Sequence, residues 1–255
     1  MKRLPFYILY DILRNRIVIA YTIFLFLVTL GLFQIEENNG KAILSLLTII
    51  LLVVPLICMI FTTIHYYNSY EFIELMLSQP VSRTRLLLSE YAGVTFALLI
   101  AFLIGVGGPV LFYTQNSIGV ALVVAGVALT LVFISIAFLA SVKTRDKARG
   151  IGLTLLLWFY FSLLFDGIIL LILFTFGDYP MEKLTIILSS LNPVDLARVS
   201  IMLQLDISAV MGYTGALHKA FYGSSAGIIA TVIVMILWIT IPLLLALRSF
   251  RKKDL

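Results

Sequence analysis

Residues 42–64 read AILSLLTIILLVVPLICMIFTTI, a run of 23 residues without one charged side chain. At about 1.5 Å of rise per residue, a helix of this length can cross the ~30 Å hydrocarbon layer of a membrane. Backbone amides find no water there, so the segment is expected to be helical and to satisfy its own hydrogen bonds. Five further apolar runs resemble it, at residues 17–33, 94–113, 118–142, 151–176 and 225–247.

The six runs predict an all-α integral membrane protein with six transmembrane helices. A soluble protein would need six helices that are apolar on every face, in a chain of which only 12% of the residues are charged. We expect residues 1–255 to form one transmembrane domain with an outer segment at 177–224. The first run is not followed by a signal-peptidase pattern, so it is expected to be a retained span.

Lysine and arginine residues are unevenly distributed around these runs. If the N-terminus is cytoplasmic, 14 of the 18 fall in cytoplasmic segments, and only Lys41, Lys183, Arg198 and Lys219 fall outside. Acidic residues divide evenly and carry no orientation signal. The positive-inside rule therefore predicts that both termini are cytoplasmic. The basic excess sets topology, and we expect no nucleic-acid binding.

The segment between the second and third runs predicts a short helix at the cytoplasmic face. Asn68, followed three residues later by Glu71, has the pattern of a capping box. Pro80 ends this helix, and Ser82 offers an N-cap for the next one. The nine residues 69–77 are too few to cross a membrane, so the helix is expected to lie across its inner surface. Taken alone, the pattern is equally consistent with a simple interfacial helix.

The sequence of this segment resembles the signature of the ABC-2 family of transporter permeases. In that family the loop is a coupling helix that docks into a groove of the ATPase subunit. The resemblance therefore implies an ATPase-coupling surface formed by Glu71, Phe72, Glu74, Leu75, Leu77, Pro80, Val81 and Arg83. Residues 2–16, which combine an apolar stripe with basic residues, resemble the amphipathic helix that precedes the first span in these permeases and lies against membrane lipids.

Family resemblance also implies partners. The chain contains no Gly-x-x-x-x-Gly-Lys-Ser/Thr motif, so it is not expected to be an enzyme or to hydrolyse ATP itself. The resemblance implies a permease homodimer in the bacterial inner membrane with two copies of a cytoplasmic ABC ATPase, which bind ATP and magnesium. Force from the ATPase pair would pass through residues 70–85 to the spans.

The outer segment contains a second predicted helix. Asn192 is a good N-cap, Pro193 suits the first helical position, and Asp195 lies in the first turn, where the helix dipole favours a carboxylate. We expect the helix to end near Leu205. A turn-rich stretch at 211–216 follows.

Residues 191–198 together with 211–215 resemble a narrower group of the family, the NosY-type permeases of copper-processing systems that mature nitrous oxide reductase. This resemblance implies a periplasmic β-helical partner seated on the outer segment, and possible contact with a copper lipoprotein chaperone. The residues expected to contact the periplasmic partner are Asn192, Pro193, Asp195, Arg198 and Tyr213. Copper would be handled by the periplasmic proteins.

Copper ligation by the chain itself is not expected. Candidate soft ligands are scattered and lack Met-x-x-Met, Cys-x-x-Cys or His-x-His spacing: Cys58, Met59, Met181, Met202, Met211 and His218. His65 is interpreted as an interfacial residue. No metal site and no resident cofactor are therefore predicted.

Asp166 is the one ionisable residue inside an apolar run. Such a group either lines a dimer interface or substrate path, or makes a structural hydrogen bond near the outer surface. Other functions stay open as alternatives. An ABC-2 exporter of a drug, lipid or polysaccharide would share the coupling loop, and Asp166 gives weak support to a secondary carrier. An intramembrane enzyme has almost no catalytic residues available.

Overall fold

The computed structural model describes residues 4–36, 38–78, 82–175, 187–204 and 225–252, and these ranges contain helices and no strand. Tyr213, Pro80 and Val81 lie outside them, as does the stretch 211–216. The all-α prediction is confirmed. In chain order the helices are α1 (Leu4–Leu13), α2 (Arg16–Ile35), α3 (Asn39–Asn68), α4 (Tyr70–Leu77), α5 (Arg83–Phe102), η1 (Leu103–Gly107), α6 (Gly108–Tyr113), α7 (Ser117–Lys143), α8 (Lys147–Phe159), η2 (Tyr160–Leu164), α9 (Phe165–Thr175), α11 (Pro193–Gln204) and α13 (Ser225–Arg251).

Six helices in the described ranges are long and apolar enough to span a membrane. Spans 1, 2, 4 and 6 are the helices α2, α3, α7 and α13. Span 3 is α5, η1 and α6 in one continuous rod, and span 5 is α8, η2 and α9. Each of these helices overlaps one of the six apolar runs, so the prediction of six long apolar helices is confirmed.

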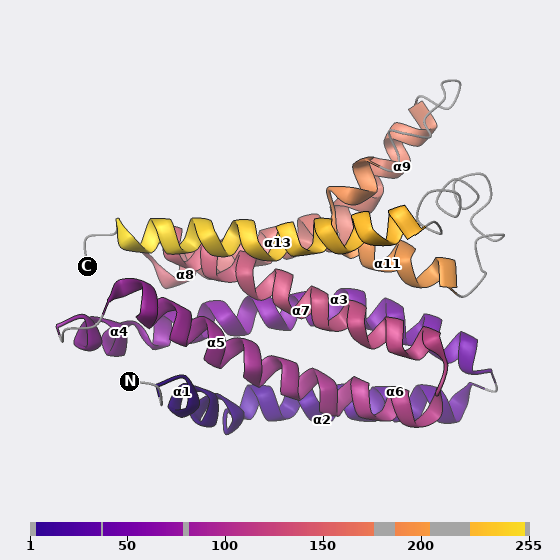
Figure 1. The fold of residues 1–255 in the computed structure, drawn as a ribbon, viewed down its shortest axis with the longest axis horizontal. Coiled ribbons are helices and arrows are strands. Elements are labelled where there is room, and N and C mark those ends of the chain that lie inside the picture. The colour runs from indigo at the N-terminus through magenta and orange to yellow at the C-terminus, as the bar shows by residue number, and fades with distance from the viewer. Residues whose placement is uncertain (1–3, 37, 79–81, 176–186, 205–224, 253–255) are drawn as a thin grey trace.

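Helix α7 is the central element of the bundle (Figure 1). It packs against α3, α5, α8, α11 and α13. In an apolar stretch of 18 residues, 67% of the positions are buried in α7, whereas the buried share is 17% in span 5 and 11% in span 6. Spans 5 and 6 are therefore the peripheral spans, and most of their apolar surface faces away from this chain.

Two glycines allow unusually close packing inside the bundle. A Cβ on Gly126 of α7 would overlap the ring of Phe102, which is fully buried at the end of α5. A Cβ on Gly105 would lie 2.7 Å from Cβ of Leu25 and 3.1 Å from the carbonyl oxygen of Thr22. Lipid tails are as apolar as the helices, so close van der Waals packing at small residues is a main source of association between spans.

Short π-helical turns interrupt spans 3 and 5. The glycines at 105, 107 and 108 suggest a break in span 3, but the rod continues through η1, and Pro109 lies in the first turn of α6. A π-turn accommodates an extra residue without leaving the helix. In span 5, η2 lies where α9 turns away from the rest of the bundle (Figure 1).

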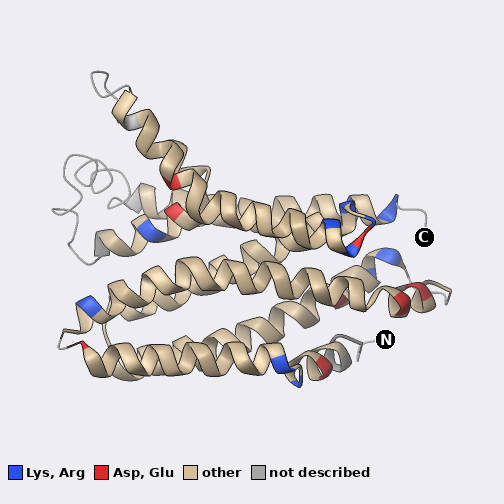
Figure 2. Ribbon diagram, turned by 180° about the vertical axis from the view of Figure 1, so that it is seen from behind, with Lys and Arg blue, Asp and Glu red and all other residues tan. Residues whose placement is uncertain are grey.

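Charged side chains gather at the two ends of the bundle (Figure 2). We call the end that carries α1, α4, the α7–α8 junction and the C-terminal end of α13 the basic end. Of the described Lys and Arg residues, only Lys41 and Arg198 lie elsewhere. This arrangement agrees with the uneven charge distribution of the sequence.

The predicted capping box at Asn68 is wrong. Helix α3 continues through Asn68, and Ser69 is the N-cap of α4, without a side-chain hydrogen bond to the helix. The Asn68 side chain is used elsewhere, because its Oδ1 accepts a hydrogen bond from Nζ of Lys147 at 2.8 Å. The predicted N-cap at Ser82 is confirmed by position, again without a side-chain hydrogen bond.

Replacing Gly126 with alanine tests the close packing of α7. The added methyl group would meet Cε1 and Cε2 of Phe102 at 2.9 and 2.8 Å, and a fully buried ring has little room to move. We expect a loss of about 1–3 kcal/mol in stability, seen as a lower midpoint of thermal unfolding of the purified protein. Gly31→Ala is the control, because nothing lies within 4 Å of its added Cβ. Equal midpoints for the two variants would contradict this packing.

Candidate functional site

Helix α4 presents a mixed acidic and apolar surface at the basic end. Glu71 and Glu74 are exposed, and so are the apolar side chains of Phe72 (39%) and Leu75 (63%). Ile73, by contrast, is fully buried and fixes the opposite face of the helix to the bundle. Exposed aromatic and aliphatic side chains beside carboxylates are typical of a surface that contacts another protein.

Other predicted coupling residues are less accessible. Leu77 is half-buried, and Arg83 is half-buried at the start of α5. Nη1 of Arg83 donates to the carbonyl oxygen of Arg251 at 3.2 Å. Nε of Arg251 donates to Oγ1 of Thr84 at 2.9 Å. Arg83 therefore helps to join the end of span 6 to the start of span 3.

A largely buried histidine–carboxylate contact lies directly beside α4. Nε2 of His65, in the last turns of α3, lies 3.1 Å from Oε2 of Glu90 in α5. Glu90 is 2% exposed, and Oγ of Ser69 lies 3.4 Å from the same histidine nitrogen. This pair connects spans 2 and 3 at the level where α4 leaves the bundle.

The next residues of α3 connect it to spans 4 and 5. The hydroxyl of Tyr67 bonds with Oγ1 of Thr144 and donates to the carbonyl oxygen of Ser141 at 3.3 Å. The tyrosine ring lies against Gly150 of α8, where a Cβ would overlap it. Through these contacts and the Asn68–Lys147 bond, the end of α3 holds the α7–α8 junction.

These contacts make α4 part of one connected unit. His65, Tyr67 and Asn68 precede the helix and attach to spans 3, 4 and 5. Arg83 and Thr84 follow it and attach to span 6. The segments on either side of α4 are therefore connected to five spans through polar contacts at the basic end.

Helix α1 supports the same end of the bundle. Its Ile8 and Ile12 are buried, and Ile8 lies against Gly93 of α5, where a Cβ would overlap the isoleucine side chain. Arg14 lies over the ring of Tyr10, 4.5 Å from its centroid. The amphipathic helix expected over residues 2–16 is observed over Leu4–Leu13.

At the opposite end, α11 begins as predicted. Oδ1 of Asn192 accepts the backbone N–H of Val194 at 3.0 Å, and Pro193 is the first residue of the helix, which ends at Gln204. The fully buried amide of Asn192 also donates to the carbonyl oxygen of Phe161 at 2.9 Å. Phe161 belongs to η2, so the N-cap of α11 is also fixed to span 5.

Asp166 and Arg198, predicted separately, form an ion pair. Nη1 of Arg198 lies 2.6 Å from Oδ2 of Asp166 and 3.0 Å from Oδ1 of Asp195. Burial of Asp195 raises the pKa of its carboxyl group to about 7; Asp166 also raises the pKa, and Arg198 lowers it. One guanidinium group thus holds two carboxyl groups, one from span 5 and one from α11.

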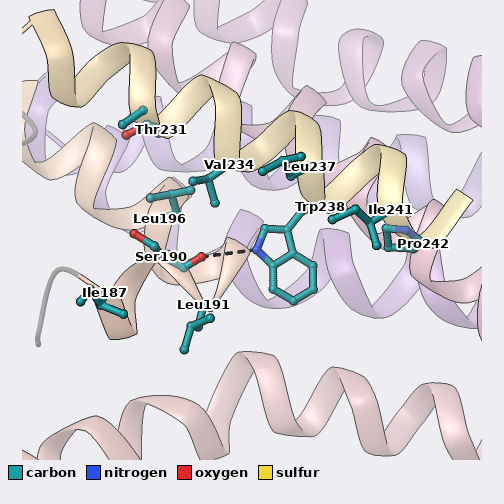
Figure 3. Close-up of a pocket in the computed structure, with 11 residues that line it drawn as sticks. Ile187, Ser190, Leu191, Leu196, Thr231, Val234, Leu237, Trp238, Ile241 and Pro242 are labelled. Atoms are coloured by element: carbon teal, nitrogen blue, oxygen red, sulfur yellow. Dashed lines mark hydrogen bonds between the residues drawn. The ribbon is translucent and has the colours of Figure 1, made fainter. Parts of the chain in front are cut away.

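An apolar groove of about 580 Å³ lies beside this cluster, between α13 and the segment that leads into α11. Its lining includes Leu191, Leu196 and Val234, and Trp238 donates its indole N–H to the carbonyl oxygen of Ser190 at 3.4 Å (Figure 3). The residues that line the groove include no ionisable side chain. Its walls therefore suit a hydrocarbon surface and offer no charge to bind an ion.

Within the described ranges, no group of three or more His, Cys, Asp or Glu side chains is placed to hold a metal ion. Cys58 and Met59 are fully buried in α3. Met202 lies in α11. Met181, Met211 and His218 lie outside the described residues.

Comparison with known proteins agrees with this architecture. The family model described as "ABC-2 family transporter protein" matches residues 9–255. The chain belongs to the ABC-2 family. The family implies a transmembrane permease subunit that works with an ATPase partner, and the six spans show that this permease is a multi-pass membrane protein.

Two curated relatives share one name. This permease is 28% identical to the probable ABC transporter permease protein NosY of Stutzerimonas stutzeri, in an alignment 267 residues long that covers 95% of each chain. It is also 28% identical to the protein of that name from Pseudomonas aeruginosa, in an alignment 266 residues long that covers 96% of this chain and 95% of the relative. The similarity therefore extends over essentially the whole permease.

The His65–Glu90 pair was missed by sequence reasoning, which interpreted His65 as an interfacial residue. The sequence does contain a pattern that indicates a buried partner for Glu90. Leu86, Leu87 and Val94 recur at helical spacing on the buried face of α5, and Glu90 falls on the same face. An acid on an apolar stripe requires a buried partner, although the stripe does not identify that partner.

Replacing Glu90 with alanine should destabilise the permease, because it removes the partner of His65 and empties a buried position. We expect a loss of about 1–3 kcal/mol, measured as a lower midpoint of thermal unfolding in detergent. Glu90→Gln keeps the size and a hydrogen-bonding group, so its loss should be smaller. The control Glu71→Ala removes an exposed carboxylate and should change the midpoint little. A Glu90→Ala protein as stable as the control would show that the pair contributes nothing.

Proposed function

We propose that this permease couples ATP hydrolysis by a cytoplasmic ATPase to a periplasmic partner that supplies copper during the assembly of nitrous oxide reductase. The proposed assembly contains two permease copies and two ATPase copies in a bacterial inner membrane, with both permease termini in the cytoplasm. The observation that carries the coupling part is the position of α4: one face is exposed, Ile73 on the other face is buried, and the residues on either side of the helix contact five spans.

The exposed face of α4 suits an ATPase groove. Phe72 and Leu75 supply apolar contact area, and Glu71 and Glu74 supply charges that can be matched by basic residues of the partner. The basic end of the bundle lies on the cytoplasmic side under the positive-inside rule, so α4 faces the compartment that contains ATP.

Closure of the ATPase pair would push on α4 and move the polar contacts behind it. His65 and Glu90 transmit the displacement to spans 2 and 3, and Tyr67 transmits it to spans 4 and 5. Packed helices move as rigid units because their interiors are close-packed. The opposite end of the same spans carries α11, which we propose as part of the seat of the periplasmic partner. Of the four residues of α11 and its N-cap predicted to contact that partner, Asn192, Pro193 and Asp195 are buried and would position the helix, and the half-buried Arg198 is accessible for direct contact.

The copper assignment rests on likeness to the NosY permeases over the full chain. In this proposal the permease provides motion and the periplasmic β-helical protein handles the copper, together with a copper lipoprotein chaperone. The ATPase supplies the catalytic site, and the permease acts as a non-enzymatic subunit without a bound cofactor.

Replacing both Glu71 and Glu74 with lysine should abolish copurification of the ATPase with the permease. Both side chains are exposed, so the charge reversal acts on the docking surface and leaves the fold intact. Glu36→Lys, a charge reversal at the opposite end of the bundle, is the control and should retain the ATPase. Normal copurification of the double variant, with an unchanged unfolding midpoint, would contradict docking at α4.

Deleting the permease gene should leave nitrous oxide reductase in its host without its full copper content. Copper per enzyme subunit, measured by elemental analysis of the purified reductase, checks this outcome. Reintroduction of the wild-type gene should restore copper, and the Glu71→Lys/Glu74→Lys gene should not. A fully copper-loaded reductase in the deletion strain would refute the copper role and favour an exporter of another substrate.

A further inference from the structure

The charge balance around Arg198 is uneven. Its guanidinium group contacts the carboxyl groups of both Asp166 and Asp195 through the same nitrogen, Nη1. Asp195 is 5% exposed, and its second oxygen, Oδ2, is buried without a hydrogen-bond partner. If both carboxyl groups were ionised, the cluster would carry one excess negative charge in a largely apolar environment.

Within the part of the chain that the structure describes, the elements packed against α11 offer no second cation to the cluster. Helix α11 packs against α3, α7, α13 and η2. Among the described residues, α7 and α13 carry their basic side chains at the basic end (Lys143, Arg248 and Arg251), and Tyr160 is the one titratable group of η2. In α3, Lys41 is the one lysine, and it does not shift the pKa of the Asp195 carboxyl group.

A proton is the smallest ligand that removes this imbalance. We propose that the Asp166–Asp195 pair is a proton-binding site, in which Asp195 holds the proton and the loaded cluster fastens α11 to the bend of span 5. A protonated Asp195 gives its unpartnered oxygen a hydrogen to donate, and it leaves Arg198 and Asp166 as a balanced ion pair. The site lies where the Asn192–Phe161 bond attaches α11 to η2.

Electrostatics of the cluster place this proton in the neutral range. Burial raises the pKa of Asp195 to about 7, Asp166 raises it as well, and Arg198 opposes the shift. A folded-state pKa above the unfolded value of about 3.8 means that the folded protein binds more protons between the two values. This contribution to stability is therefore complete at acidic pH and is lost as the pH rises from about 4 to about 7.

At high pH, two carboxylates would compete for one guanidinium group, and α11 would be held less firmly. The cluster lies at the end of the bundle opposite α4. In the proposed orientation that end is periplasmic, so the cluster would respond to the pH outside the cytoplasmic membrane. This inference does not depend on copper or on the ATPase, and its test is separate from theirs.

The first test is infrared spectroscopy of the full-length permease in lipid nanodiscs, titrated from pH 5.5 to pH 8.5. The C=O stretch of a protonated, buried carboxylic acid should be present at the acidic end and should disappear as the pH passes about 7. Asp195→Asn should remove this band at every pH. The control Glu36→Gln removes another carboxylate from the same end of the bundle and should leave the band in place.

The two neighbours should move the titration in opposite directions. Asp166→Asn removes a negative charge, so the band should be lost at a pH lower by about one unit or more. Arg198→Gln removes a positive charge, so the band should persist to higher pH. Thermal unfolding midpoints should follow: the wild-type midpoint falls between pH 5.5 and pH 8.5, and that of Asp195→Asn stays nearly constant.

Several outcomes would overturn the proton site. They are the absence of a protonated-carboxyl band from the wild type at pH 5.5, survival of the band in Asp195→Asn, and shifts of the same sign in Asp166→Asn and Arg198→Gln. The infrared measurement on the wild type alone decides the first, so it remains informative even where a variant unfolds.

Discussion

Satisfaction of backbone hydrogen bonds in hydrocarbon is the constraint from which the rest of this structure follows. It forces each apolar run into a continuous helix, and it explains why spans 3 and 5 pass through π-turns instead of breaking. The hydrocarbon environment also leaves few polar side chains that distinguish one span from another, because the lipid-facing surfaces of all the spans are similarly apolar. Specific contacts are therefore concentrated where polar groups are tolerated, at the two ends of the bundle and at small residues within it.

The two ends have different polar architectures. At the basic end the contacts are distributed: His65–Glu90, Tyr67–Thr144, Asn68–Lys147 and Arg251–Thr84 each join a different pair of helices. At the opposite end, the described contacts include single bonds such as Asn39–Tyr113 and Trp238–Ser190, and the charged ones are concentrated where α11 meets the bend of span 5 at Asp166. A distributed set of contacts spreads a local displacement over many helices. A concentrated set fixes one element, and its strength can be changed by a single charge.

Local patterns predicted the fold well and the sites only in part. Apolar length identifies every span, and the Asn192-Pro193 pair marks the start of α11 because capping depends on adjacent residues alone. The pairs His65–Glu90 and Asp166–Arg198 are 25 and 32 residues apart, and their formation depends on how the spans pack. The capping box predicted at Asn68 is wrong for the same reason. The Asn68 side chain, which the local pattern assigned to α4, accepts a hydrogen bond from Lys147 of another helix instead. The π-turns have no local signature, because one extra residue per turn does not alter an all-apolar pattern.

Span 5 is the element in which the two ends meet. Its first part, α8, is attached to α3 at the basic end through the contact of Tyr67 with Gly150. Its second part, α9, begins at Phe165, carries Asp166 in its first turn and diverges from the bundle after the π-turn η2 (Figure 1). Between these two attachments, Trp158 of α8 donates its indole N–H to the carbonyl oxygen of Leu52 in α3 at 3.0 Å, so α8 is held to span 2 up to the π-turn. A helix that is attached on both sides of a π-turn is expected to concentrate its bending at that turn. A push at α4 is thus expected to reach α11 chiefly as a change of angle at η2. There Asn192 is bonded to Phe161, and Arg198 is bonded to Asp166 just after the turn.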